Sequence, residues 1–151
     1  MAAVAIWLLF PTRERQVRHK LKALAGWASK DGNEGQLATA MKARDADRFF
    51  APKCEWSTEG EELSGTLSPS DIGRFMFAYR SHWRNISLKF YDVQVEFPEH
   101  SAANVTATVL LRGESESGDD LNETHEVTCA LEKGDGGWKI TKVTVVQVLK
   151  K

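Results

Sequence analysis

The sequence is short of cysteine, of excess charge and of long apolar runs, and each absence excludes a class of function. Its two cysteines, Cys54 and Cys129, have no neighbouring cysteine or spaced histidine, which argues against a disulfide framework or a zinc knuckle. The 20 Lys and Arg residues nearly balance 21 Asp and Glu residues, so no net charge draws the chain to nucleic acid. The four histidines show no metal-binding spacing, and we expect neither a metal nor another cofactor.

The longest apolar run, AAVAIWLLF before Pro11, is far below the roughly 20 residues that span a bilayer. Two interpretations compete for residues 1–11. In the first, they form an arm packed on the domain; in the second, they are the end of a membrane anchor or signal segment. We favour the second interpretation, because the apolar run follows Met1 directly. The remaining residues, 12–150, have the length of one domain with a single core. We expect membrane contact only through the apolar segment.

Three helices are predicted in the first half of the chain. Thr12 is the expected cap of a helix over about residues 13–29, and a second helix over about 34–50 is expected to stop at Ala51-Pro52. Ser68, with Pro69 at the first helical position and Asp71 three residues after the cap, predicts a third helix opened by a capping box. The predicted core face of this helix is apolar and aromatic and consists of Ile72, Phe75, Met76, Tyr79 and Trp83.

Alternating apolar and polar residues predict strands in the remainder. A short hairpin is expected from strands at 54–56 and 62–65, followed by long strands over 86–97, 103–114, 124–133 and 138–149. The apolar residues change phase near Phe90-Tyr91 and again between Ile140 and Val143, near Lys142. A β-bulge explains each change, and two bulges predict a strongly curved sheet.

The run LATAMKARDADRFFAPKCEWSTEGEELSGTLSPSDIGRFMFAY resembles the nuclear transport factor 2-like superfamily, which includes SnoaL-like and ketosteroid isomerase-like proteins. The resemblance implies a cone-shaped α+β barrel, with three helices from the N-terminal half packed on a curved, mainly antiparallel sheet. It also implies a homodimer through the outer sheet face, for which the outward candidates are Leu110, Val146 and Val148. The apolar start is similar to bacterial members with a membrane anchor. We therefore expect a protein anchored to a bacterial membrane, on an undetermined side, or otherwise cytoplasmic.

Enzymes of this superfamily place a carboxylate or a histidine on the strands around the cone. The matching segment Trp56-Ser57-Thr58 has no carboxylate, and an inward set of Val127, Cys129 and Leu131 leaves Glu126 outside. His125 and Cys129 lie roughly 13 Å apart along a strand, too far for an activated thiol. We therefore predict no catalytic residue and lean away from an enzyme.

The expected function is a non-enzymatic module that binds a small hydrophobic ligand or a protein. Its predicted pocket is lined by Trp56, Met76, Tyr79, Trp83, Tyr91 and Cys129. The alternative is an isomerase, dehydratase or polyketide cyclase-like enzyme that acts on a small hydrophobic substrate. A one-residue slip in strand register would favour this alternative, because it would move Glu126 and Thr128 inside.

Overall fold

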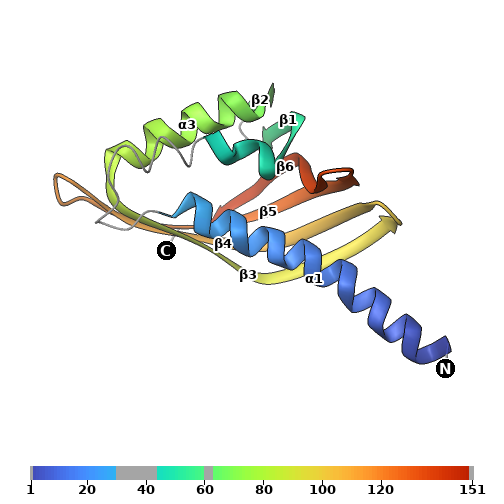
Figure 1. The fold of residues 1–151 in the computed structure, drawn as a ribbon. Helices are drawn as coiled ribbons and strands as arrows, with labels where there is room; N and C mark the ends of the chain where they lie inside the picture. The colour runs from blue at the N-terminus through green and yellow to red at the C-terminus, as the bar shows by residue number, and fades with distance from the viewer. Residues whose placement is uncertain (1, 30–43, 60–62, 150–151) are drawn as a thin grey trace.

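The computed structural model describes residues 2–29, 44–59 and 63–149. The chain forms helices mainly in its first half and long strands in its second half (Figure 1). In chain order the elements are α1 (Ala2–Ala28), the 3-10 helix η1 (Arg44–Arg48), β1 (Phe50–Thr58), β2 (Leu63–Leu67), α3 (Pro69–His82), β3 (Trp83–Glu99), β4 (Ala102–Ser115), β5 (Asp120–Gly134) and β6 (Gly137–Leu149).

All six strands belong to one sheet with the order β2-β1-β6-β5-β4-β3. Strands β1 and β6 run parallel, and every other neighbouring pair is antiparallel. Figure 1 shows α3 lying over the sheet and α1 beside β3. The predicted curved, mainly antiparallel α+β architecture is therefore confirmed.

Bulges occur close to both predicted positions. In β3 the pairing with β4 shifts between Tyr91 and Gln94, and Asp92 has a positive φ of 52°. In β6 the pairing with β5 shifts around Thr141, whose hydroxyl donates to the Ala130 carbonyl at 3.2 Å. An extra residue bends the strand and increases its twist, so these two positions account for part of the curvature.

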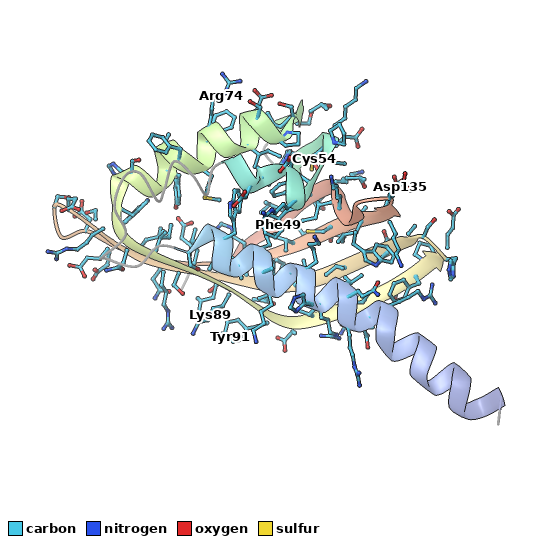
Figure 2. All side chains as sticks on the ribbon, viewed as in Figure 1. Phe49, Cys54, Arg74, Lys89, Tyr91 and Asp135 are labelled. Atoms are coloured by element: carbon cyan, nitrogen blue, oxygen red, sulfur yellow. The ribbon has the colours of Figure 1, made fainter. Side chains whose placement is uncertain are left out.

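The core lies between the inner face of the sheet and the helices. On α1, Val17, Leu21 and Leu24 are buried at helical spacing, and Trp27 packs its ring 5.4 Å from that of Phe49. The sheet contributes alternate residues of the central strands β4, β5 and β6, including Ala103, Val105, Cys129, Leu131, Trp138 and Ile140. Figure 2 shows all described side chains, with Phe49 and Cys54 labelled.

The predicted start of the first helix after Thr12 is wrong. The helix α1 begins at Ala2 and continues through Pro11 to Ala28. A proline inside a helix removes one backbone hydrogen bond and crowds the carbonyl four residues earlier, but the alanine, leucine, arginine and lysine residues on either side favour a helix. Among the described residues no helix is long and apolar enough to cross a membrane.

Most of the predicted second helix, residues 34–43, lies outside the described residues. Its predicted end at Phe50 is wrong: η1 ends at Arg48, and Phe50 is already the first residue of β1, which includes Pro52. Both Phe49 and Phe50 are buried, so tertiary burial directs the chain into the sheet before the proline. The described residues thus contain two α-helices and one 3-10 helix in place of three α-helices.

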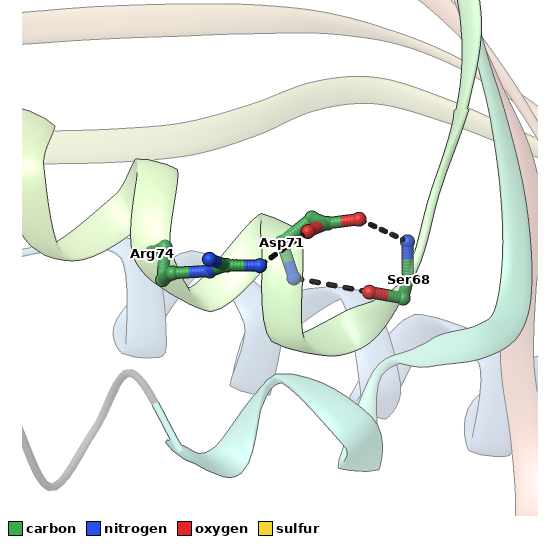
Figure 3. Close-up of polar contacts among 3 residues, drawn as sticks. All are labelled: Ser68, Asp71 and Arg74. Atoms are coloured by element: carbon green, nitrogen blue, oxygen red, sulfur yellow. Dashed lines mark hydrogen bonds and ion pairs between the residues drawn. The ribbon is translucent and has the colours of Figure 1, made fainter.

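The third helix begins as predicted, with reciprocal bonds between Ser68 and Asp71 (Figure 3). Its predicted core face is partly wrong, because Phe75 is 65% exposed and Tyr79 is 41% exposed. The helix packs on η1 and β1 through the side that carries Ile72 and Met76. Phe75 and Tyr79 lie on the adjacent side of the helix, which faces solvent. Trp83, also assigned to this face, is instead the first residue of β3.

Candidate active site

The inner face of β5 changes from apolar to polar along its length. Cys129 and Leu131 are buried, and they pair with the buried residues Val105 and Ala103 of β4. His125 follows the same alternation and pairs with the buried Val109. Strand residues separated by an even number share a face, so His125 lies on the inner face of the cone.

A histidine–carboxylate pair stands on this inner face. His125 Nε2 lies 3.0 Å from Glu123 Oε2, and the two residues are separated by one position on the strand. The His125 side chain is 21% exposed and that of Glu123 is 47% exposed. His125 Nδ1 is buried and has no hydrogen-bond partner among the described residues. When Nε2–H donates to Glu123, Nδ1 carries the lone pair of a neutral imidazole and can accept a proton.

The end of α3 brings a tyrosine and two further aromatic groups toward this pair. The rings of Tyr79 and Trp83 lie 6.1 Å apart, and the His82 ring meets Trp83 edge-on at 5.5 Å. Burial raises the pKa of the Tyr79 phenol, and the negative charge of Glu123 raises it further. The neighbouring Trp83 side chain opposes this shift. The phenol therefore stays protonated at neutral pH, and its response to Glu123 places it within electrostatic reach of the pair.

The deeper end of the inner face carries two thiols that are not activated. Burial raises the pKa of Cys54 to about 11, an effect that the nearby Trp56 side chain partly opposes, and burial raises the pKa of Cys129 to about 12. Both thiols are free and buried. Since the thiolate is the reactive form, neither group is activated at neutral pH.

The six predicted ligand residues do not form one site. Trp56 and Met76 are half-buried against the core, and Cys129 is fully within it. Tyr79 and Trp83 lie together near the histidine–carboxylate pair. Tyr91, at 45% exposure, instead lines a groove between α1 and β3. Among the described residues no group of three or more His, Cys, Asp or Glu side chains could hold a metal ion.

The pair of Glu123 and His125 is the feature that the sequence interpretation missed. Glu126 is exposed, as predicted, so the proposed register slip does not occur. The same alternation that places Val127, Cys129 and Leu131 inside also places His125 and Glu123 inside when it is continued toward the start of the strand. From the sequence, His125 was weighed only as a partner of Cys129, and Glu123, two residues from His125 on the same face, is the group that was not considered.

Comparison with known proteins supports the fold. No protein-family model matches the chain, and neither does any curated protein. An NTF2-like protein with a cystatin-like fold from Novosphingobium aromaticivorans superimposes with a TM-score of 0.72 at 10% identity, covering 97% of this chain and 88% of that one. A candidate dehydratase of the NTF2-like family from Streptomyces avermitilis gives 0.69 at 14% identity, covering 93% and 99%.

A third similar structure is the hexachlorocyclohexane dehydrochlorinase LinA-type3 from Novosphingobium barchaimii LL02. It gives a TM-score of 0.55 at 18% identity and covers 76% of this chain and 84% of its own. At such identities the likeness concerns the fold and not the activity. The resemblance found in the sequence is confirmed at this level: the chain has the nuclear transport factor 2-like, cystatin-like α+β fold.

Proposed function

We propose that this protein is an acid–base enzyme that removes a proton from carbon in a small hydrophobic substrate, as in an elimination or an isomerisation. The observation that carries the proposal is the 3.0 Å pair of Glu123 and His125 on the inner face of the cone, with His125 Nδ1 buried and unpartnered among the described residues. A buried acceptor atom with no partner is costly in a folded protein and is a common feature of functional sites.

The residues take the following roles in this proposal. His125 Nδ1 accepts the proton from carbon, while Glu123 holds the opposite ring nitrogen and stabilises the imidazolium that forms. In an elimination the electron pair of the broken C–H bond forms the new double bond. The leaving group departs with its electron pair and takes a proton from the Tyr79 hydroxyl, which is protonated at neutral pH.

The similar structures support an elimination in particular. Two of them are named for reactions that remove water or hydrogen chloride from a substrate, namely the candidate dehydratase and the dehydrochlorinase. Both reactions need a base for a C–H proton and a site for a leaving group. The pair on β5 and the phenol on α3 supply these two groups from opposite layers of the fold.

A non-enzymatic binding module is the second candidate. The observation in its favour is exposure, because Tyr79 is 41% exposed and the Glu123 side chain 47% exposed. Catalytic groups are commonly shielded from water, which strengthens their interactions with the transition state. An open site suits reversible binding of a ligand.

Proton exchange with deuterated water distinguishes the two candidates. We would incubate the protein with a panel of small cyclic ketones and β-hydroxy ketones in D2O and follow exchange and elimination by NMR. We expect turnover of at least one compound, and a loss of roughly 10²–10⁴-fold in His125→Gln, the range for a general base. His100→Gln is the matched control, since His100 is exposed in the turn after β3. Equal rates in the His125 and His100 variants would contradict the assignment.

A further inference from the structure

A groove of about 430 Å³ lies between α1 and the bulged part of β3, outside the site described above. Its floor is apolar and consists of Leu21 and Ala25 from α1 with Phe90 and Val93 from β3. Small-molecule sites commonly occupy roughly 300–1,000 Å³ and are mostly apolar with a few polar groups. The volume and the floor of this groove match that description.

The polar groups around this floor carry one sign of charge. Arg18, Lys22 and Lys89 line the groove, and no acidic residue in the described part of the chain does. Glu14 lies 3.5 Å from Arg18 and offsets that charge in part. Lys22 and Lys89 have no ion-pair partner among the described residues, although the whole chain has a net charge of −1. The groove is thus a local concentration of positive charge above an apolar surface.

The two walls of the groove are tied together at both ends. Arg18 Nη2 donates to the Val93 carbonyl at 2.9 Å, and the Leu88 N–H donates to the Ser29 hydroxyl at 3.1 Å. These bonds join the helix to the strand on either side of the cationic residues. A ligand therefore meets a groove whose shape is already set, which lowers the entropy cost of binding.

A β-strand from a partner is a poor occupant of this groove, although β3 is an edge strand. Asp92 has a φ of 52°, and the register shifts between Tyr91 and Gln94, so the backbone groups are not in line to pair with a new strand. The Val93 carbonyl is already bonded to Arg18. Figure 2 labels Lys89 and Tyr91 on β3 beside α1, where they offer side-chain donors at the rim.

We propose that the groove between α1 and β3 binds a small amphiphilic anion, a carboxylate or similar head on an apolar body. The head lies between Lys22 and Lys89, and the apolar body covers Leu21, Ala25 and Phe90. Opposite charge favours the head, and burial of the apolar body supplies the remaining affinity. This site is independent of the pair on β5 and does not require catalysis.

Calorimetric titration with octanoate tests the proposal, with octyltrimethylammonium and 1-octanol as probes of the same length. We expect octanoate to bind the parent protein more tightly than either of the other two probes does. We expect the double variant Lys22→Gln/Lys89→Gln to bind octanoate about tenfold more weakly than the parent protein, which is the effect of losing two exposed ion pairs. The matched control is Lys53→Gln/Lys142→Gln, which removes two exposed lysines from β1 and β6 and changes the net charge equally. This control is expected to bind octanoate as the parent protein does.

A second variant tests the apolar floor without a change of charge. Ala25→Leu places a larger side chain in the groove, and a melting curve shows whether the fold is retained. Weaker octanoate binding in this folded variant supports the proposal. Equal binding of octanoate and octyltrimethylammonium, no binding of octanoate, or unchanged binding in the Lys22/Lys89 variant overturns it. The proposal is also overturned if His125→Gln loses octanoate binding while the groove variants keep it, because the anion would then occupy the site on β5.

Discussion

Removal of the Ser68 hydroxyl at the start of α3 is expected to destabilise the protein measurably. The hydroxyl accepts from the Asp71 N–H at 3.2 Å, and Asp71 Oδ2 accepts from the Ser68 N–H at 3.2 Å (Figure 3). Both distances lie at the long end of the range for N–H···O bonds. For Ser68→Ala we therefore expect the lower part of the usual capping range, a loss of about 0.5–1 kcal/mol in the free energy of unfolding.

The assay is urea denaturation followed by circular dichroism, together with thermal melting. For a chain of this length, such a loss corresponds to a fall in Tm of roughly 1–4 °C. Ser70→Ala is the matched control, because Ser70 is exposed in the same helical turn and alanine is the better helix former. If Ser68→Ala and Ser70→Ala had the same stability, the capping bonds would contribute nothing and the reasoning would be refuted.

The carboxylate of the same capping box adds a dependence on pH. The hydrogen bond from the Ser68 N–H lowers the pKa of Asp71, with smaller effects from the Ser68 hydroxyl and Arg74. Because the pKa is lower in the folded state, the stabilisation is complete above the unfolded pKa of about 3.9 and is lost as the pH falls through the folded value. We expect Asp71→Asn to be less stable than the parent at pH 6, with a difference that shrinks in acid. A difference that does not vary with pH would contradict the assigned cause.

Three further predictions follow from packing and charge. Gly113→Ala should cost about 1–3 kcal/mol in urea denaturation, since its Cβ would lie 2.8 Å from a backbone carbonyl of β3. Gly65→Ala, whose Cβ would meet no described atom within 4 Å, is the control. In a Tyr91→Phe background, which leaves Tyr79 as the single tyrosine, Glu123→Gln should lower the phenol pKa in a spectrophotometric titration. Both cysteines should resist iodoacetamide at pH 8 until the protein is unfolded, because their pKa values are about 11 and 12.

Local sequence chemistry accounts for the element types and several boundaries. The capping box at Ser68 and Asp71 starts α3 where expected, because both bonds are made within four residues. The phase changes in β3 and β6 mark real bulges within two residues of the predicted positions, since a strand on a core must keep its apolar residues on one face. Helix ends were less predictable: α1 continues through Pro11, and the burial of Phe50 assigns it to β1.

The candidate active site depended on information that is not local. Inward positions on β5 follow from alternation alone, so Glu123 could have been assigned from the sequence to the same face as His125 and Cys129. Their direct contact requires particular side-chain orientations, and the approach of Tyr79 requires α3 to cross to the start of β5. Neither follows from spacing along the chain.

The sequence by itself determined most element types and the curvature of the sheet, because periodicity and capping act over a few residues. The tertiary structure decided which aromatic residues are buried and which charges gather. It exposes Phe75 and places Arg18 and Lys22 opposite Lys89, although these residues lie far apart in the chain. Contacts between distant segments depend on how the helices and the sheet pack, and no local pattern records that packing.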